Sequence, residues 1–355
     1  FLQFGNGNLF KKTKFYYQNK IEKESKEDIV LSFAPYKFIG KNKKIIPLSG
    51  ISNKKTILCL DKKNKPVVYK SDKFGFNNEN EQNLRFLIIG DSYVHGQCVE
   101  NKFNLVNQIN SSGNRAAGLG IYANGPLLEY ATFIEYAPYY SYDTLIWVFT
   151  PDNDFFDVSL EIKEPILKKY YESGVTQDLF QNNTIREKII YAYLNKRKKR
   201  KAREFARLYH LDLAIIRGFI KSLDDEKTSF KKRFHYHFSS KSVNFIQDLF
   251  NKVKNHSKKN NKNLIIVINA INPDIMFPDN KETRDLKILL LKDIKKLKEF
   301  FDQNQIKYVD FNKKIENEYN KKNINEVFNR IRSKWDHYTP KGYAILNQEI
   351  LDSIN

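Results

Sequence analysis

Cysteine is nearly absent from this chain of 355 residues, which contains only Cys59 and Cys98. Two thiols either form a disulfide in an oxidising compartment or are two unrelated buried residues, and the sequence leaves both interpretations open. A bridge would connect the N-terminal region to the segment that follows Ser92. The two cysteines and six histidines show no cluster with the spacing of zinc ligands, so we predict neither a metal nor a cofactor.

Long apolar runs are also missing, because no segment reaches the ~18 uninterrupted apolar residues of a membrane-spanning helix. The sequence begins at Phe1 rather than Met. We therefore expect that an upstream segment, a signal or anchor helix, has been removed. This interpretation predicts an extracytoplasmic location in the cell envelope, either periplasmic or anchored by that segment.

Acidic residues are outnumbered, which gives a formal net charge of +20. The basic residues are mostly lysine, spread along the chain with many Asn, Ile and Phe, so part of this excess is attributed to codon bias. A positive surface favours an anionic partner such as an acidic polysaccharide, a lipid headgroup or nucleic acid. No nucleic-acid recognition motif accompanies the charge, and nucleic acid is therefore the least favoured. The basic run 196–201 is either a solvated helix face or a docking surface for an anionic polymer or a membrane.

The hydrophobic pattern from Arg85 onward predicts strands that alternate with helices. The hydrophobic content of 41% is enough for a substantial core. Alternation of this kind implies a parallel sheet with right-handed crossovers, and therefore an α/β fold. The expected strands are 85–90, about 115–120, 144–149, 263–268 and 306–310, and the expected helices are about 101–111, 126–137, 282–303 and 340 to the end.

Two further regions flank or interrupt this alternation. Residues 1–80 are polar and turn-rich, and we expect an N-terminal extension that packs on the core and contains strands at 55–60 and 66–70. Residues 156–261 are charged and mainly helical, which predicts a basic insertion. Within it, the amphipathic stretch 206–220 could pack on the core or close over a cleft. The remaining segments, 81–155 and 262–355, form the predicted catalytic domain.

A candidate nucleophile follows the first core strand. Residues 85–96 read RFLIIGDSYVHG, so a buried strand ends at Gly90-Asp91-Ser92 and places a hydroxyl at the carboxyl edge of the sheet. Serine needs a base, and His337 near the other end of the chain can supply one, which suggests acyl transfer. The alternatives are a helix N-cap for Ser92 and an ordinary surface role for His337. We expect His95 to be structural rather than to line the cleft.

Four short blocks, in order along the chain, resemble the SGNH/GDSL hydrolase family. Residues 90–93 are similar to its nucleophile block, with Tyr93 in place of the usual Leu. Residues 118–126 resemble the second block, and residues 151–154 the third. Residues 337–343, with the pattern H-x-T-x-x-G-Y, resemble the last block. The resemblance covers roughly 81–155 and 262–355, about half of the chain.

The resemblance implies a three-layer α/β/α, flavodoxin-like domain and a set of catalytic roles. Ser92 would be the nucleophile and His337 the base. The oxyanion hole would be formed by the backbone N–H of Ser92, a backbone N–H of the second block and the Asn153 side chain. The second-block glycine of the family falls on Ala123, whose N–H can still act as the donor if φ stays negative, and Gly120 is the alternative donor.

The residue that orients His337 stays open. The family places an acid two or three residues before the histidine, where this chain has Trp335 and Lys334. The preferred candidate is Asp336, although adjacent side chains in extended backbone point apart, so a local turn would be needed. Asp310 is a second candidate, and a backbone carbonyl is a third.

Rival motifs are incomplete in this sequence. Gly90 to Gly96 lacks the Gly-Lys-Ser/Thr ending of a phosphate-binding loop. Gly118-x-Gly120 lacks the third glycine and the acidic partner of a dinucleotide site. The nucleophile elbow of α/β-hydrolases requires a glycine where Val94 stands.

The sequence therefore predicts an ester hydrolase or O-acyltransferase that acts on acylated, in particular O-acetylated, carbohydrate. Lipid ester hydrolysis is the enzymatic alternative. A second alternative is a non-catalytic glycan-binding or assembly protein on the same fold, in which the acid has been displaced and the cleft only binds.

Overall fold

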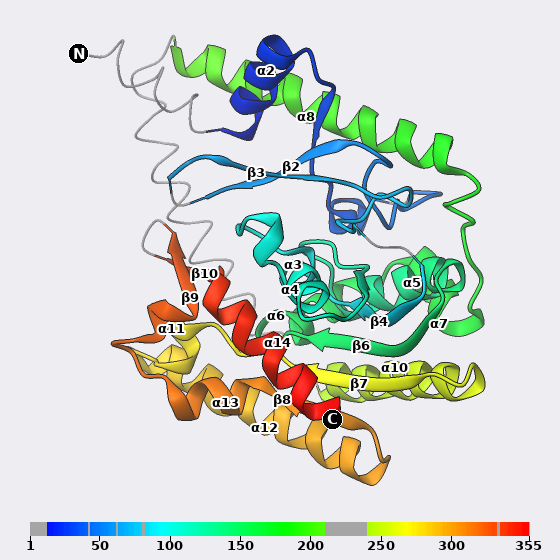
Figure 1. Cartoon of the computed structure of the whole chain (residues 1–355), viewed down its shortest axis with the longest axis vertical. Helices are drawn as coiled ribbons and strands as arrows, with labels where there is room; N and C mark the ends of the chain where they lie inside the picture. Colours follow the sequence, from blue (N-terminus) through cyan, green and yellow to red (C-terminus); the bar gives the residue numbers. More distant parts are fainter. Residues whose placement is uncertain are drawn as a thin grey trace.

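The computed structural model contains a central parallel sheet with helices on both faces (Figure 1). It describes residues 13–41, 43–61, 63–79, 82–209, 240–331 and 334–354. Within these ranges, the side chains of 202, 204–209, 240–241, 331 and 334–336 are not described.

The central sheet has five strands in the order β5-β4-β6-β7-β8, and every neighbouring pair is parallel. The strands are β4 (Leu84–Ile89), β5 (Ala116–Gly118), β6 (Tyr142–Phe149), β7 (Asn263–Ile268) and β8 (Lys307–Asp310). The first strand thus lies between the second and the third, which is the order of flavodoxin-like folds. Such folds bind ligands at the carboxyl ends of the first and third strands, where the direction of winding reverses. The predicted fold class is confirmed, and the expected place for a site lies between the ends of β4 and β6.

The two central strands, β4 and β6, end in continuous apolar runs because both faces of the sheet are covered there. Residues 86–89 of β4 and 145–149 of β6 are all 0% exposed. This is the pattern of a parallel sheet enclosed between helices. One layer contains α4 (Leu105–Ser111) and α14 (Pro340–Ile354), which contact each other; the other contains α5 (Pro126–Tyr136), α10 (Ser240–Lys259) and α12 (Lys281–Gln303).

The described part of the predicted insertion is helical. It includes most of α6 (Pro151–Glu161), then α7 (Pro165–Ser173), α8 (Asn183–Tyr209) and α10. In α10, Val243, Ile246, Phe250 and Val253 recur at helical spacing and are buried, and this helix contacts β7 and α5. The last helix of the predicted insertion therefore covers the central sheet. The stretch 206–220 lies largely outside the described residues, and the division of the chain into three parts stays a prediction.

The N-terminal region forms a small sheet of its own, in the order β1-β2-β3. Its elements are α2 (Lys14–Ser25), β1 (Ile29–Leu31), the 3-10 helix η1 (Pro35–Phe38), β2 (Lys55–Leu60) and β3 (Pro66–Lys70). Figure 1 shows β2 and β3 between the long helix α8 and the core. This agrees with the expected strands at 55–60 and 66–70.

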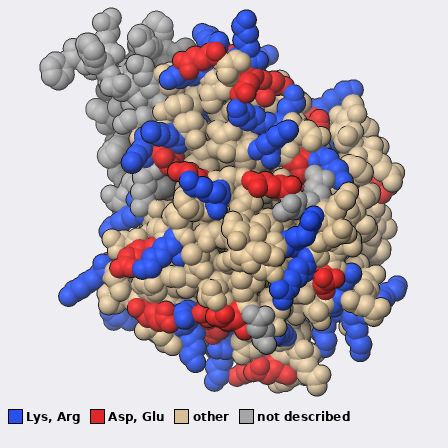
Figure 2. Space-filling view, in the orientation of Figure 1, with Lys and Arg blue, Asp and Glu red and all other residues tan. Residues whose placement is uncertain are grey.

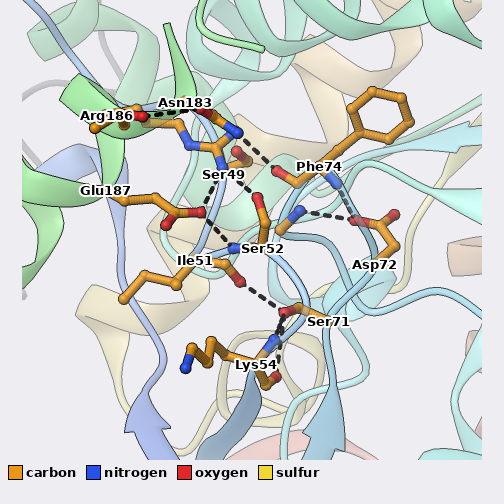
Figure 3. Close-up of polar contacts among 12 residues, drawn as sticks. Ser49, Ile51, Ser52, Lys54, Ser71, Asp72, Phe74, Asn183, Arg186 and Glu187 are labelled. Carbon is orange, nitrogen blue, oxygen red and sulfur yellow. Dashed lines mark hydrogen bonds and ion pairs between the residues drawn. The ribbon is translucent and has the colours of Figure 1, made fainter. Parts of the chain in front are cut away.

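A fully buried arginine holds this region to the helices of the core (Figure 3). Arg186 of α8 donates to the Phe74 carbonyl at 3.1 Å, to the Tyr136 hydroxyl at 3.2 Å and to Ser52 Oγ at 2.5 Å. Its guanidinium also lies 3.2 Å from Glu187, which accepts from the Ser52 N–H. Because a buried charge must be paired and hydrogen-bonded, this network fixes α8 against the N-terminal segment and α5.

Cys59 and Cys98 are not joined by a disulfide in the structure. Cys59 is buried on β2 and packs in a small apolar cluster with Val67 and Tyr69, and Cys98 lies partly buried against the same cluster. The structure therefore contains no bridge, and it places both thiols at one apolar cluster rather than as the unrelated buried residues of the second interpretation. Among the described residues, no helix has the length and apolarity needed to cross a membrane.

Candidate active site

Ser92 lies where the sequence predicts it, just beyond the carboxyl end of β4. It begins α3 (Ser92–His95), and the side chain of Asp91 caps this helix by accepting the Tyr93 N–H at 2.9 Å. The turn requires a glycine at position 90, because a Cβ there would lie 2.6 Å from Val94 Cγ2 and 3.0 Å from the Val148 carbonyl. The absence of a side chain at Gly90 thus allows β4 to end in a sharp turn and allows this turn to lie against Val148 of β6.

His337 lies next to Ser92, although 245 positions separate them in the chain. The distance from His337 Nε2 to Ser92 Oγ is 2.7 Å, a short hydrogen bond. His337 stands on β10 (Lys334–Tyr338), which pairs in antiparallel fashion with β9 (Phe328–Ile331). The sequence analysis expects these two side chains to meet at one edge of the sheet, and the structure brings them together there.

Tyr338, the residue after the histidine, fixes β10 to the sheet. Its hydroxyl donates to Asn269 Oδ1 at 2.5 Å and accepts from the Ala270 N–H at 3.2 Å, both just after β7. Its ring is fully buried and packs on Tyr93, with the ring centroids 4.6 Å apart. The Tyr93 ring also contacts His337 at 4.9 Å. A β-bulge between Trp335 and Tyr338 breaks the regular alternation of β10, so both rings contact Tyr93 while His337 faces Ser92.

Asn153 reaches the same site from the start of α6, after the end of β6. Its Nδ2 donates to Asp91 Oδ2 at 3.0 Å. An amide nitrogen carries two hydrogens, so this bond orients the group and leaves the second hydrogen for another acceptor. Asp91 is fully buried, and burial raises its pKa, an effect that the hydrogen bonds from the Tyr93 N–H and Asn153 oppose. Asp91 is therefore a positioning residue between the serine helix and the asparagine.

The loop after β5 carries the second-block residues, and its backbone differs from the prediction. Ala123 has φ +62°, in the left-handed region, so the condition of a negative φ, under which alanine replaces glycine without strain, is not met. The physical reason is the tight turn into α5, which demands a conformation that glycine adopts freely and alanine only with strain. Gly120 is required for another purpose, since a Cβ there would lie 2.5 Å from Val94 Cβ and 2.7 Å from the His95 nitrogen.

His95 is hydrogen-bonded to the backbone of this loop. Its Nδ1 accepts the Tyr122 N–H at 3.2 Å, and its Nε2 lies 3.2 Å from the Tyr69 hydroxyl. Burial, together with the nearby charges of Lys14 and His337, lowers the pKa of His95 to about 3. The ring is therefore neutral near pH 7, with its proton on Nε2. The structural role predicted for His95 agrees with these contacts.

Sequence reasoning missed the residue that closes the other end of the loop. Glu161 of α6 accepts hydrogen bonds from the N–H groups of Gly125, Leu127 and Leu128 and so caps α5. Burial and the charge of Asp157 raise the pKa of Glu161 to about 8, against the effect of these three donors. A cap supplied from 33 to 36 positions away leaves no local signal in the sequence.

The structure argues against one of the candidates for the residue that orients His337. Asp310 caps α13 (Phe311–Glu318) by accepting the Lys313 N–H at 2.9 Å, and its other oxygen lies 2.7 Å from Lys298 Nζ. Both of its oxygens are thus engaged in contacts away from the histidine. The side chain of Asp336 lies outside the described residues, so its role stays a prediction.

No group of three His, Cys, Asp or Glu side chains within the described residues is arranged to hold a metal ion. The site consists instead of a serine and a histidine in contact, an oriented amide and a strained loop. This combination can transfer a proton from a hydroxyl and can surround a developing negative charge with N–H donors.

No protein-family model matches the chain, and no curated protein matches it. Among solved structures, it is similar to the crystal structure of a member of the lipolytic protein G-D-S-L family from Veillonella parvula DSM 2008, with 11% sequence identity and a TM-score of 0.39. The match covers 75% of this chain and 96% of that chain. The family named there is the one that the sequence blocks resemble.

Proposed function

We propose that the protein is a serine-dependent ester hydrolase or O-acyltransferase that acts on acylated, in particular O-acetylated, carbohydrate. The observation that carries the proposal is the 2.7 Å contact between Ser92 Oγ and His337 Nε2 at the carboxyl ends of β4 and β6. A neutral imidazole nitrogen at this distance can take the hydroxyl proton.

The proposed reaction has two halves. His337 Nε2 accepts the Ser92 proton while Oγ bonds to the ester carbonyl carbon, and the carbonyl oxygen becomes an oxyanion. The second hydrogen of Asn153 Nδ2 and the backbone N–H groups of Ser92 and of Ala123 or Gly120 stabilise that charge. The oxyanion then collapses, the alcohol leaves with the proton from His337, and an acyl group remains on Ser92. Water or a sugar hydroxyl removes the acyl group by the same steps in reverse.

The preference for carbohydrate rests on the net charge of the protein and on its predicted location in the cell envelope. A net charge of +20 suits an anionic envelope polymer better than a neutral lipid. The proposal therefore includes an extracytoplasmic location in the cell envelope. A preference for p-nitrophenyl esters of long acyl chains over p-nitrophenyl acetate would instead favour a lipid esterase.

The decisive experiment compares p-nitrophenyl acetate hydrolysis by the wild type and by Ser92→Ala. We expect the variant to lose at least 10³-fold in kcat, because it lacks the nucleophile. Ser173→Ala, which changes an exposed serine on α7, serves as the matched control and should keep the wild-type rate. Trapping of the acetyl group on the peptide that contains Ser92 would identify the covalent intermediate. Equal rates for the wild type and Ser92→Ala would leave the non-catalytic binding protein as the better hypothesis.

A further inference from the structure

A groove of about 1310 Å³ lies between the segment 37–45 and one face of α8. Nine of its lining side chains are basic: four lysines between 37 and 44 form one wall, and five residues between 196 and 203 form the other. Among the described residues that line it, none is acidic. Figure 2 shows a different pattern on the face in view, where basic and acidic side chains are interspersed. The groove is therefore a local concentration of positive charge rather than a sample of the whole surface.

The two walls are close enough for their charges to repel. Burial lowers the pKa of Lys37, and the charges of Arg197 and Lys41 lower it further. Arg197 belongs to α8, whereas Lys37 and Lys41 belong to the opposite wall. An anion between the walls would relieve this repulsion and would interact with both sides at once.

The shape of the groove suits a chain rather than a single ion. Its lining extends along α8 from Ile189 to Arg203, which is about 21 Å at the rise of an α-helix. Between the charged walls it is lined by apolar residues that include Phe38 and Tyr193, whose ring centroids are 5.7 Å apart. A linear polymer with repeated negative charges matches a long cationic groove of this kind.

One wall of the groove approaches the loop that follows β5. Burial raises the pKa of Tyr122 in that loop, and the charge of Arg197, which lines the groove, opposes that rise, so Arg197 lies near Tyr122. The Tyr122 N–H in turn donates to His95 Nδ1, in the helix that Ser92 begins. A polymer bound at Arg197 would therefore lie near Tyr122, which precedes Ala123 in the loop that carries a proposed oxyanion donor.

We propose that this groove binds a linear carboxylated polysaccharide, and that this polymer is the acylated substrate. The claim that the polymer is the acylated substrate rests on the proposed function, whereas the claim that the groove binds the polymer does not. A bilayer surface fits less well, because membrane-binding faces project their apolar side chains outward, whereas here they lie between charged walls. Single-stranded nucleic acid fits less well, because base stacking needs exposed rings and Phe38 is 6% exposed.

The test measures binding to polygalacturonate and to its methyl-esterified form at 0.15 M salt by calorimetry. The two polymers share a backbone and differ in charge. We expect the wild type to bind the acidic polymer, to bind the methyl ester at least ten-fold more weakly, and to lose affinity as ionic strength rises. Equal affinity for both polymers, or no binding of the acidic one, would overturn the proposal.

Matched variants locate the site. Lys41→Gln, Lys44→Gln and Lys199→Gln together remove exposed charges from both walls, and we expect them to weaken binding about ten-fold or more. The control combines Lys188→Gln, Lys292→Gln and Lys295→Gln, which remove as many exposed charges outside the groove. Equal affinity of the two triple variants would show that the groove is not the site.

Two further arms separate the other ligands and the proposed function. Tighter binding to phosphatidylglycerol vesicles or to oligo(dT) than to polygalacturonate would replace the polysaccharide by a membrane or by nucleic acid. Ser92→Ala should bind polygalacturonate like the wild type, and the groove variant should hydrolyse p-nitrophenyl acetate like the wild type. If the wild type binds polygalacturonate but does not hydrolyse p-nitrophenyl acetate, the result counts against the proposed function and not against the groove as a binding site.

Discussion

The most informative perturbation of the site is Asn153→Ala. In the structure, one hydrogen of Asn153 Nδ2 is held by Asp91 at 3.0 Å, so the amide is already oriented before any substrate binds. Loss of one oriented oxyanion donor costs about 3 kcal/mol of transition-state stabilisation, which corresponds to a fall in kcat of about 10² to 10³-fold. KM should change little, because the donor acts on charge that develops during the reaction.

The same substitution has a predictable effect on folding. It removes a hydrogen bond to a buried carboxylate, and we expect the free energy of unfolding to fall by about 2 kcal/mol. Steady-state hydrolysis of p-nitrophenyl acetate gives kcat and KM, and urea denaturation gives the free energy of unfolding. Asn317→Ala, at an exposed position of α13, is the control for handling and should match the wild type in kcat. An Asn153→Ala enzyme that folds and keeps its kcat would refute the assignment of Asn153 to the oxyanion hole.

Three other predictions concern the loop, the buried histidine and the acid. Ala123→Gly should raise the free energy of unfolding by about 1 kcal/mol in urea denaturation, because it relieves a left-handed backbone conformation. The pKa of His95 is lowered to about 3 in the folded protein and is near 6.5 when unfolded, so its contribution to stability is complete above pH 6.5 and is lost as the pH falls toward 3. Between pH 7 and pH 5 we expect the wild type to lose about 2 kcal/mol more than His95→Gln, as measured by denaturation at each pH. Asp336→Asn should lower kcat by about 10³ to 10⁴-fold, whereas Asp310→Asn should leave kcat unchanged.

Each of these outcomes has a clear contrary result. A destabilised Ala123→Gly would mean that loop entropy outweighs the strain. Parallel pH profiles for the wild type and His95→Gln would show that the ring is charged in the folded protein or exposed. Normal activity of Asp336→Asn would favour orientation of His337 by a backbone carbonyl.

The fold was predictable because its signals are local. The strand at 263–268 and the helix at 282–303 follow from apolar runs and helical spacing, and the structure places β7 and α12 within a residue of those limits. Alternation of such segments already implies a parallel sheet. Local patterns did not reveal that α10 would cover that sheet, since an amphipathic helix has an apolar face whatever it packs against.

The features of the site also fall into those that local sequence patterns predict and those that they do not. Ser92 and His337 could be proposed from short motifs, because their chemistry depends on residue type and on the end of a strand. Three other features depend on segments that meet only after folding, and no local pattern encodes them. They are the positive φ of Ala123, the hydrogen bonds from the start of α5 to Glu161, and the hydrogen bond from Asn153 to Asp91.

The sequence by itself determined the order of strands and helices, the nucleophile and base candidates, and an excess of positive charge. Tertiary structure decided which of these act together: it placed His337 against Ser92 on a strand that Tyr338 holds to the sheet, and it brought the lysines of 37–44 and the basic run of α8 to the two walls of one groove. The physical reason is that periodicity and composition are properties of neighbours in the chain. Proton transfer and electrostatic focusing depend instead on distances in space, which long-range packing sets.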